Sequence, residues 1–200
     1  LTNLTYLGLS SNNISTIRPL SGLTNLIRLD LSVNNISNIN PLFGLTKLTE
    51  LHLSNNAISD TVPLSALTGL IKLDLSANNI SDISPLSALT NLTELGLSYN
   101  KVSYILPLAR LTNMTRLWLD GNDISDIGLF WWEWTNLTIL WLDRNNISDI
   151  SALAELTTLQ YLWMTSNPLD CDAYLIVIPL IIENNPGIDI TYDPMPPECY

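Results

Sequence analysis

The sequence predicts an α/β solenoid, a fold in which similar turns of chain stack on one another. Three observations support this prediction. A motif recurs every 22 residues along most of the 200-residue chain, its apolar residues fall at the same places in every copy, and each copy carries one asparagine at the same place. Because a single turn of this length cannot bury its own apolar side chains, neighbouring turns have to share one core.

Eight copies of the motif can be aligned by their first residue. Most open with Leu-Thr-Asn-Leu or a close variant, and the first residues are Leu1, Leu23, Leu45, Leu67, Leu89, Leu111, Trp134 and Leu156. The spacing is 22 residues except for one interval of 23 residues, between Leu111 and Trp134. Within a copy the apolar residues occupy positions 1, 4, 7, 9, 14, 17 and 20, so these side chains are expected to point inward.

The twelfth position is asparagine in every copy. An amide side chain has both donors and an acceptor, so it can bond the backbone of its own turn and of the adjacent turn. Buried backbone groups need such partners where the chain bends. We therefore expect a structural ladder, and no ligand site, from Asn12, Asn34, Asn56, Asn78, Asn100, Asn122, Asn145 and Asn167.

The spacing LxxLxLxxN, present in eight copies, is the signature of leucine-rich repeats. Each unit continues as in residues 80–86 (ISDISPL), so it resembles the 22-residue repeats of bacterial internalins and related short-repeat proteins. The resemblance covers residues 1–169. It implies a leucine-rich repeat arc with a parallel sheet on its concave side and short 3₁₀ or extended segments on its convex side. It also implies that the chain binds other proteins and is not an enzyme.

The third copy departs from the pattern at its inward isoleucine position. Thr61 stands there, and the apolar Val62 follows it. We expect a local shift of the chain that turns Val62 inward in place of Thr61.

The sixth copy contains the extra residue and an aromatic run, GLFWWEW. Trp134 takes a leucine position of the motif, so it is predicted to lie in the core. Trp131 and Trp132 cannot both point inward beside Leu129 and Phe130. At least one of these two tryptophans is therefore expected on the convex surface.

The sequence changes character after Asn167. The open end of a solenoid exposes an apolar turn and needs a cap. We therefore divide the chain into repeats over residues 1–169, the eighth copy merging into the cap, and a C-terminal capping segment over residues 170–200. In the cap, a short apolar helix is expected over residues 173–182 and a final segment over residues 187–192. The opening N-P-L-x-C is similar to the cysteine-bearing caps of secreted leucine-rich repeat proteins.

Cys171 and Cys199 are the two cysteines of the chain, and both lie in the expected cap. A disulfide between them would tie back the C-terminal tail, with a stabilisation of about 2–4 kcal/mol. Such a bond indicates an oxidising compartment, outside the cell or at its surface. Two free thiols are the alternative, and they would favour an intracellular protein.

The charge balance argues against two classes of partner. Eight Lys and Arg residues face 19 Asp and Glu residues, which gives a net charge of −11 and a pI near 4.1. Nucleic acids and anionic membrane surfaces are both bound through an excess of basic residues. The longest apolar run also falls short of the roughly 20 residues that span a bilayer. We expect neither a nucleic-acid partner nor membrane insertion.

Catalytic, cofactor and metal motifs find no support in the sequence. His52 is the one histidine, and Glu50 shares its face, but no Ser or Cys nucleophile stands at a spacing typical of a catalytic triad. No glycine-rich phosphate loop is present. His52 and Cys171 belong to turns too far apart to share a zinc ion. We expect no catalysis, no cofactor and no metal.

The concave face carries the most informative residues. Side chains alternate along a strand, so the residues between the inward leucines face solvent on the concave side. The eighth position is tryptophan in three consecutive copies, predicted about 4.8 Å apart, and aromatic, aliphatic and basic residues occupy the sixth position beside it. With three residues of the adjoining rim, these form the predicted ligand site: Trp118, Trp141, Trp163, Arg116, Ile139, Tyr161, Asp120, Asp143 and Arg144.

This site indicates non-catalytic recognition of a protein ligand by a secreted or surface-displayed module, because Trp, Tyr and Arg dominate binding hot spots. Trp118, Trp141, Trp163 and Tyr161 are the expected anchors. A glycan is an alternative ligand, since aromatic faces stack on sugar rings. An intracellular scaffold and a passive spacer of a larger surface protein are the alternative functions; the chain begins at Leu1 within the pattern, which suggests a fragment.

Two other origins of the tryptophan column remain open. The sixth and seventh copies share the phrase Leu-Trp-Leu-Asp, so a duplication can have copied a tryptophan without any selection for binding. The cap, or a second copy of the chain in a dimer, can also cover the column. In either case the indoles would not mark a ligand site.

Overall fold

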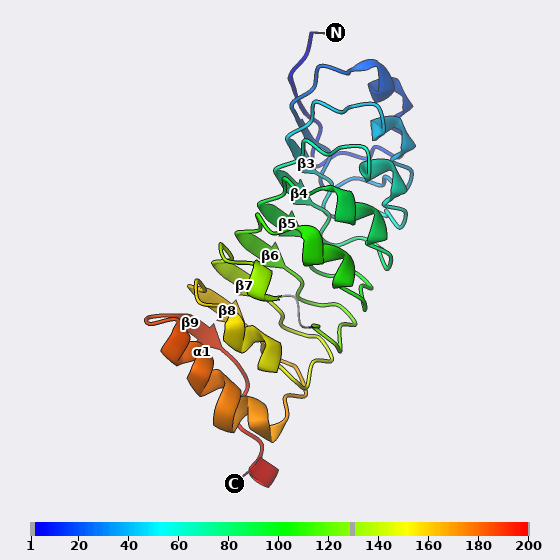
Figure 1. Cartoon of the computed structure of the whole chain (residues 1–200). Helices are drawn as coiled ribbons and strands as arrows, with labels where there is room; N and C mark the ends of the chain where they lie inside the picture. Colours follow the sequence, from blue (N-terminus) through cyan, green and yellow to red (C-terminus); the bar gives the residue numbers. More distant parts are fainter. Residues whose placement is uncertain (1–2, 129–130, 200) are drawn as a thin grey trace.

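The computed structural model describes residues 3–128 and 131–199, except for the side chain of Trp132, and it shows an elongated arc (Figure 1). Among the described residues, nine short parallel strands follow one another in sequence order across a single sheet. On the opposite side the chain returns through short helices, most of them 3₁₀. The predicted solenoid with one parallel sheet and a 3₁₀ side is therefore confirmed.

Each of the first seven repeats contributes one strand and one 3₁₀ helix, the eighth contributes a strand, and the cap adds the ninth strand. The strands are β1 (Tyr6–Gly8), β2 (Arg28–Asp30), β3 (Glu50–His52), β4 (Lys72–Asp74), β5 (Glu94–Gly96), β6 (Arg116–Trp118), β7 (Ile139–Trp141), β8 (Tyr161–Trp163) and β9 (Asp189–Thr191). The 3₁₀ helices of the repeats are η1 (Arg18–Gly22), η2 (Asn40–Leu42), η3 (Val62–Leu64), η4 (Ser84–Ala88), η5 (Leu106–Arg110), η6 (Trp131–Glu133) and η7 (Ser151–Glu155). Proline near the start of η1 to η5 supplies a backbone angle that suits a helix and lacks an N–H that would stay unpaired.

The strands pair in register, so equivalent residues of successive repeats lie side by side. Leu117 of β6, for example, is opposite Leu95 of β5 and Leu140 of β7. The middle residue of each strand from β2 to β8 is a leucine that is almost fully buried in the core. Its two neighbours in the strand therefore face the concave side, which is what turns the sixth and eighth positions of the motif into columns.

The asparagine ladder is confirmed in detail. Asn78 donates from Nδ2 to the carbonyl oxygens of Leu75, in its own turn, and of Leu53, in the preceding turn, at 2.9 and 3.0 Å. Its Oδ1 accepts from the backbone N–H of Ile58 at 2.9 Å. The same pattern recurs at each described copy from Asn34 to Asn167. The side chain thus joins each turn to the one before it.

The expectation for the third repeat is wrong. Thr61 itself points inward and is 2% exposed, whereas Val62 is 58% exposed. The Thr61 hydroxyl donates to the carbonyl oxygen of Asp82 in the next turn, at 3.0 Å. Because this bond satisfies the buried hydroxyl, the repeat keeps its register and no shift toward Val62 is needed.

The sixth repeat accommodates its extra bulk within the core. Trp131 and Trp134 are both buried, with their rings 4.9 Å apart in an edge-to-face arrangement. The Trp131 indole N–H donates to the carbonyl oxygen of Ile127 at 2.7 Å. The predicted core position of Trp134 is confirmed. Since Trp131 is buried, the exposed tryptophan that the sequence predicts would have to be Trp132. Its side chain, like Leu129 and Phe130, lies outside the described part of the structure, so this stays a prediction.

The C-terminal segment closes the solenoid as expected. A five-residue π-helix, η8 (Ala173–Val177), continues into α1 (Ile178–Asn184), so the helical segment runs two residues beyond the predicted residue 182. Pro179 lies in the first turn of α1, where its missing N–H leaves no bond unmade. The apolar side chains of Ile178 and Ile181 are buried, α1 packs against η7 of the seventh repeat, and β9 adds a strand to the sheet. None of the described helices has the length and apolar character that a bilayer-spanning helix needs.

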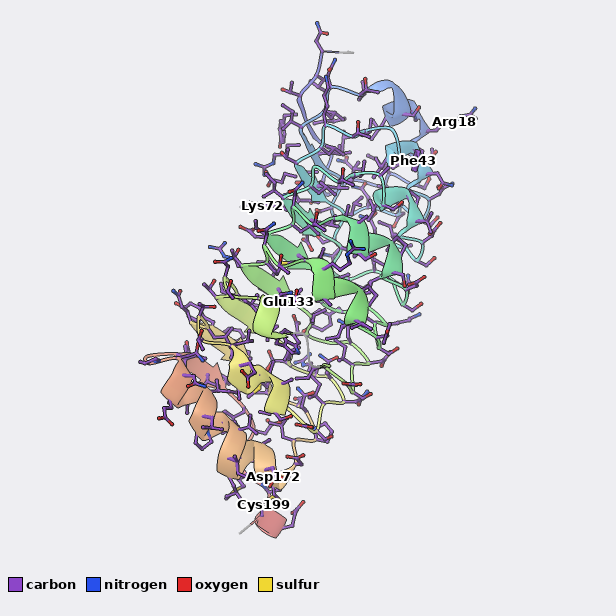
Figure 2. The ribbon with its side chains drawn as sticks, viewed as in Figure 1. Arg18, Phe43, Lys72, Glu133, Asp172 and Cys199 are labelled. Atoms are coloured by element: carbon purple, nitrogen blue, oxygen red, sulfur yellow. A yellow bond between two sulfur atoms is a disulfide. The ribbon has the colours of Figure 1, made fainter. Side chains whose placement is uncertain are left out.

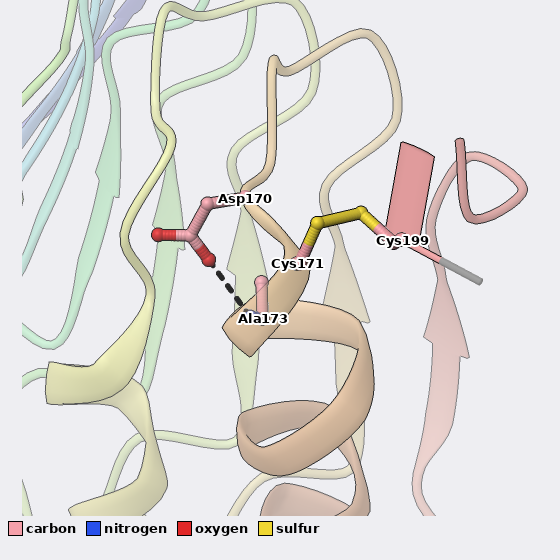
Figure 3. Close-up of a disulfide and its surroundings, with 4 residues drawn as sticks. All are labelled: Asp170, Cys171, Ala173 and Cys199. Carbon is pink, nitrogen blue, oxygen red and sulfur yellow. Dashed lines mark hydrogen bonds between the residues drawn. A yellow bond between two sulfur atoms is a disulfide. The ribbon is translucent and has the colours of Figure 1, made fainter. Parts of the chain in front are cut away.

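Cys171 and Cys199 form a disulfide, with Cα atoms 5.3 Å apart (Figure 3). Cys171 lies just before the π-helix, and Cys199 lies in the terminal 3₁₀ helix η9 (Pro197–Cys199). Beside the bond, the Ala173 backbone N–H donates to Asp170 at 2.8 Å and fixes the start of the helical segment. The predicted disulfide is confirmed, and it ties the tail to the first turn of the cap helix.

Candidate binding site on the concave face

The three tryptophans of the eighth position form a continuous column on the concave face. Trp118, Trp141 and Trp163 are paired neighbours on β6, β7 and β8. Trp141 and Trp163 stack with their rings 4.5 Å apart and 11° from parallel, whereas Trp118 meets Trp141 edge to face at 6.3 Å. All three side chains are half-buried. The column is therefore a continuous, partly open aromatic surface.

The cap does not close over this column. Strand β9 extends the sheet and sets Thr191 beside Trp163 as the next member of the eighth column. The indole N–H of Trp163 is buried and has no hydrogen-bond partner among the described residues. Leaving such a donor unpaired costs about 1–3 kcal/mol, so stability alone does not account for a tryptophan here.

The sixth column completes the apolar part of the site. Ile139 is half-buried, and Tyr161 is 43% exposed. Together with the three indoles these two side chains line a shallow hollow of about 330 Å³, named here the apolar hollow. Five of the nine predicted site residues therefore meet in one place.

Arg116 is engaged in a row of surface charges. Its guanidinium lies 3.5 Å from Glu94, which also pairs with Lys72 at 2.9 Å. A second group of the same row contains Arg28, Glu50 and His52, with Glu50 3.4 Å from Arg28 and 2.7 Å from His52. These side chains are partly exposed, so each pair contributes little to stability. Figure 2 shows Lys72 on the sheet side of the arc and Phe43 on the helical side.

The two aspartates of the predicted rim point in opposite directions along the sheet. The Asp120 carboxylate accepts from the Ser98 hydroxyl in the preceding turn. Asp143 accepts from the backbone N–H and the hydroxyl of Thr165 in the following turn, at 2.8 and 2.6 Å. Asp120 lies deeper than a rim position, because only 7% of it is exposed. The like charges are thus separated while each keeps a donor.

Arg144 and Tyr99 occupy the sharp turn that follows the strands. Both adopt the left-handed backbone conformation, with φ near 54° and 53°. The Arg144 guanidinium donates to the Tyr99 hydroxyl at 3.4 Å. The equivalent residue between them is Gly121, where a Cβ would lie 2.7 Å from the Tyr99 ring. Glycine at this position allows the ring to lie over the neighbouring turn.

Beside the tryptophan column lies a larger hollow that the sequence argument did not identify. Its volume is about 570 Å³, and it is named here the acidic hollow. Gly96 takes the eighth position on β5, and a Cβ there would lie 2.6 Å from an Asp74 carboxylate oxygen. The chief lining residues are Asp74, Glu94, Tyr99, Trp118, Asp120 and Trp141. A glycine next to a tryptophan in the same column was the sequence signal for this hollow.

The described residues were also compared with the groupings that metal sites and catalytic centres require. Within residues 3–128 and 131–199, no three His, Cys, Asp or Glu side chains lie close enough to hold a metal ion. His52, on β3, contacts Glu50 at 2.7 Å and lines the acidic hollow, and no nucleophile pairs with it among the described residues. The arrangement of apolar anchors, charged rim and shallow hollows is typical of a contact surface.

Family comparisons agree with the repeat pattern. The family model described as "Leucine Rich repeats (2 copies)" matches residues 46–88, 90–129 and 135–174, and the model "Leucine rich repeat" matches residues 2–58. None of the curated protein sequences matches the chain significantly.

Solved structures with the same fold include three bacterial proteins. An internalin from Listeria monocytogenes is 29% identical with a TM-score of 0.86, over 96% of this chain and 63% of that one. Internalin C2 from the same species is 36% identical with a TM-score of 0.67, over 82% of each chain. A leucine-rich repeat protein from Leptospira interrogans, 24% identical with a TM-score of 0.80 over 94% of this chain and 55% of that one, shares the fold.

The chain thus spans less than two thirds of the first of these structures, and it has the repeats, the sheet and the cap that the motif predicted. Family models cover most of its length. The chain belongs to the leucine-rich repeat family, with 22-residue repeats of the internalin type and a disulfide-bearing C-terminal cap.

Proposed function

We propose that this chain is a non-catalytic recognition module that binds a protein ligand on the C-terminal half of its concave face. Proteins of this repeat family are typically protein-interaction modules. The observation that carries the proposal is the continuous column of Trp118, Trp141 and Trp163, half-open on the sheet. Apolar surface of this kind, rimmed by charged groups, is typical of a contact site.

The residues of the site divide into two roles in this proposal. The indoles and Tyr161 anchor the ligand by removing apolar surface from water, which is the main source of affinity at such contacts. Arg116, Asp143 and Arg144 surround them and set the orientation of the ligand, because charges at a rim act mainly on specificity and association rate. Asp120 is buried beneath this rim and belongs to the adjoining acidic hollow.

A protein ligand is favoured over a glycan by the stacking of Trp141 on Trp163. A sugar ring needs an open aromatic face, and the two rings of this pair cover one face of each other at 4.5 Å. The exposed ring edges and the apolar hollow suit aliphatic and aromatic side chains.

We also propose that the module works outside the cytoplasm, as a secreted or surface-displayed protein. The disulfide between Cys171 and Cys199 supports this location, because such bonds persist in oxidising compartments. The intracellular scaffold suggested as an alternative would hold reduced cysteines. A count of zero free thiols in the protein isolated from its natural source tests the choice, and a count of two contradicts it.

Differential capture tests the recognition proposal. The wild-type chain, Trp141→Ser and the matched convex variant Leu106→Ser are immobilised and exposed to the same mixture of extracellular proteins. Leu106 is a suitable control because it is half-exposed on η5, on the opposite side of the arc. The proposal expects a protein retained by the wild type and Leu106→Ser but weakened by about 10- to 30-fold with Trp141→Ser. If every retained protein binds all three equally, or none is retained, the passive spacer is the better account.

A further inference from the structure

The acidic hollow combines aromatic walls with an excess of negative charge. Trp118, Trp141 and Tyr99 line it, together with three carboxylates, one lysine and one histidine, His52, which contacts Glu50. Its volume of about 570 Å³ falls in the range of sites that enclose a ligand group. It adjoins the apolar hollow, since Trp118 and Trp141 line both. A ligand lying on the tryptophan column therefore extends directly over it.

The charges within this hollow are unevenly compensated. Lys72 lies 2.9 Å from Glu94, so its positive charge is already balanced by that carboxylate. In the described part of the chain, no basic group lies within ion-pair distance of Asp74 or Asp120. Asp74 accepts only the backbone N–H of Ser76, at 3.0 Å, among the hydrogen bonds of the described residues. Two carboxylates therefore border the hollow without a cation.

Of these two carboxylates, Asp120 has the less favourable environment for a negative charge, because the residue is only 7% exposed. The Ser98 hydroxyl donates to it, but a hydroxyl does not neutralise a charge. A buried carboxylate is more stable with a cation beside it than without one. The same carboxylate borders the neighbouring hollow beside Arg144, yet that guanidinium contacts the Tyr99 hydroxyl instead.

Aromatic faces next to a carboxylate are the combination that binds a guanidinium. Its plane stacks on an indole, where the ring electrons attract the charge, and its N–H groups reach a carboxylate in pairs. An ammonium is a more strongly hydrated point charge and gains less from such walls. The hollow thus matches an arginine side chain better than a lysine.

We propose that the acidic hollow receives an arginine side chain of the protein ligand, with the guanidinium against Trp118 and paired with Asp120 and Asp74. This inference rests on the proposed function, because the ligand that lies on the tryptophan column is what brings the arginine to the hollow. It adds a chemical specificity: the ligand presents a cation next to its apolar contact surface.

Two capped tripeptides that differ only in charge test this assignment. Acetyl-Gly-Arg-Gly-amide is compared with acetyl-Gly-citrulline-Gly-amide, in which a neutral urea replaces the guanidinium. Binding is followed through the indole N–H resonance of Trp118, identified from its absence in Trp118→Phe. The arginine peptide is expected to move this resonance saturably, at millimolar concentration. The citrulline peptide is expected to bind about tenfold more weakly, because it lacks the charge.

Variants of the aspartates provide the matched control. Asp30 and Asp74 occupy the same column, and each accepts one backbone N–H two residues further on, at 3.0 Å. Only Asp74 lines the hollow. Asp74→Asn and Asp120→Asn are expected to weaken the arginine peptide about fivefold to tenfold, and Asp30→Asn to leave it unchanged. If Asp120→Asn does not fold, Asp74→Asn still decides the question.

Equal binding of the two peptides, no saturable shift with either, or equal effects of Asp74→Asn and Asp30→Asn, overturns the proposal. These outcomes are separate from the fate of the proposed function. If a captured protein needs Trp141 but binds Asp74→Asn and Asp120→Asn normally, the recognition proposal stands and the assignment of an arginine to the acidic hollow fails. Loss of all capture by the wild type removes the recognition proposal, and the peptide titration still reports on the hollow.

Discussion

The indole rings of Trp141 and Trp163 lie almost parallel, 4.5 Å apart, on neighbouring strands of the concave sheet. Each ring packs on the other, and both side chains are half-buried. This relationship follows from the exact register of β7 and β8, which places the two residues opposite each other. Side chains that already pack on each other are expected to lose less entropy on binding a ligand than side chains that move freely.

Replacing Trp141 by alanine is expected to lower the free energy of unfolding by about 1–3 kcal/mol, because a half-buried aromatic pair is lost but no core cavity opens. Trp134→Ala is the comparison, since Trp134 is fully buried and its truncation is expected to cost about 3–5 kcal/mol. Urea unfolding of both variants measures the difference. A loss for Trp141→Ala as large as for Trp134→Ala would mean that the column is core packing.

The asparagine ladder predicts that the stability lost on replacing an asparagine by alanine depends on its place along the arc. Asn78→Ala removes three donated bonds and one accepted bond in a buried layer, so a loss of about 2–4 kcal/mol is expected. Asn12 is exposed at the first turn and donates only within its own turn, so Asn12→Ala is expected to cost less than about 1 kcal/mol. Equal losses in chemical denaturation would argue against the ladder as the link between turns.

The inward position of Thr61 makes a prediction opposite to the one from the sequence pattern. Thr61→Ala is expected to destabilise the third repeat by about 1–2 kcal/mol, because it removes a buried methyl group and a hydrogen bond. Val62→Ser changes an exposed side chain and is expected to stay within about 0.5 kcal/mol. Thermal unfolding compares them. A larger effect of Val62→Ser than of Thr61→Ala would instead support a shifted register in which Val62 points inward.

Loss of the disulfide is expected to loosen the cap. Cys171→Ser with Cys199→Ser opens a loop with a sequence separation of 28 residues, and the expected loss of stability is about 2–4 kcal/mol. Hydrogen exchange should locate the change in η9 and the start of η8, while the exchange of β2 to β5 stays the same. Uniform loosening of the whole arc would show that the cap controls the repeats as well.

Two exposed carboxylates, Asp82 and Asp149, are expected to account for part of the loss of folding stability at low pH. The hydroxyl and backbone N–H of Ser84 lower the pKa of Asp82 below its usual value, and the backbone N–H and hydroxyl of Ser151 lower the pKa of Asp149. A folded-state pKa that is lowered contributes stability above the usual value of 3.8, and this contribution is lost as the pH falls through the folded pKa. The double variant Asp82→Asn, Asp149→Asn should therefore lose less in melting temperature than the wild type between about pH 5 and pH 2. An identical acid profile would contradict the assignment.

Much of this architecture is visible in the sequence because each turn repeats the same physical problem. The column of asparagines, the inward leucines and the adjacency of Trp118, Trp141 and Trp163 all follow from a constant period and a parallel register. The cap was predictable because an open solenoid end needs one. These features depend on spacing alone.

Features that depend on local side-chain geometry were not predictable in this way. The acidic hollow arises where Gly96 leaves space beside Trp118 and where Tyr99 bends over Gly121, and a motif alignment does not contain these contacts. The inward turn of Thr61 depended on one hydroxyl bond to the next repeat. The burial of Asp120 likewise depended on the position of Ser98.

Oxidative footprinting of the chain with and without its captured protein ligand shows which face of the arc the ligand covers. If the ligand lies on the concave face, binding is expected to lower the modification of Trp118, Trp141 and Tyr161. Phe43 and Tyr104, which are exposed away from the site, are expected to react as before. Protection of Phe43 or Tyr104 with unchanged reactivity of the concave indoles would contradict binding on the concave face, and would move the recognition surface to the other side of the arc.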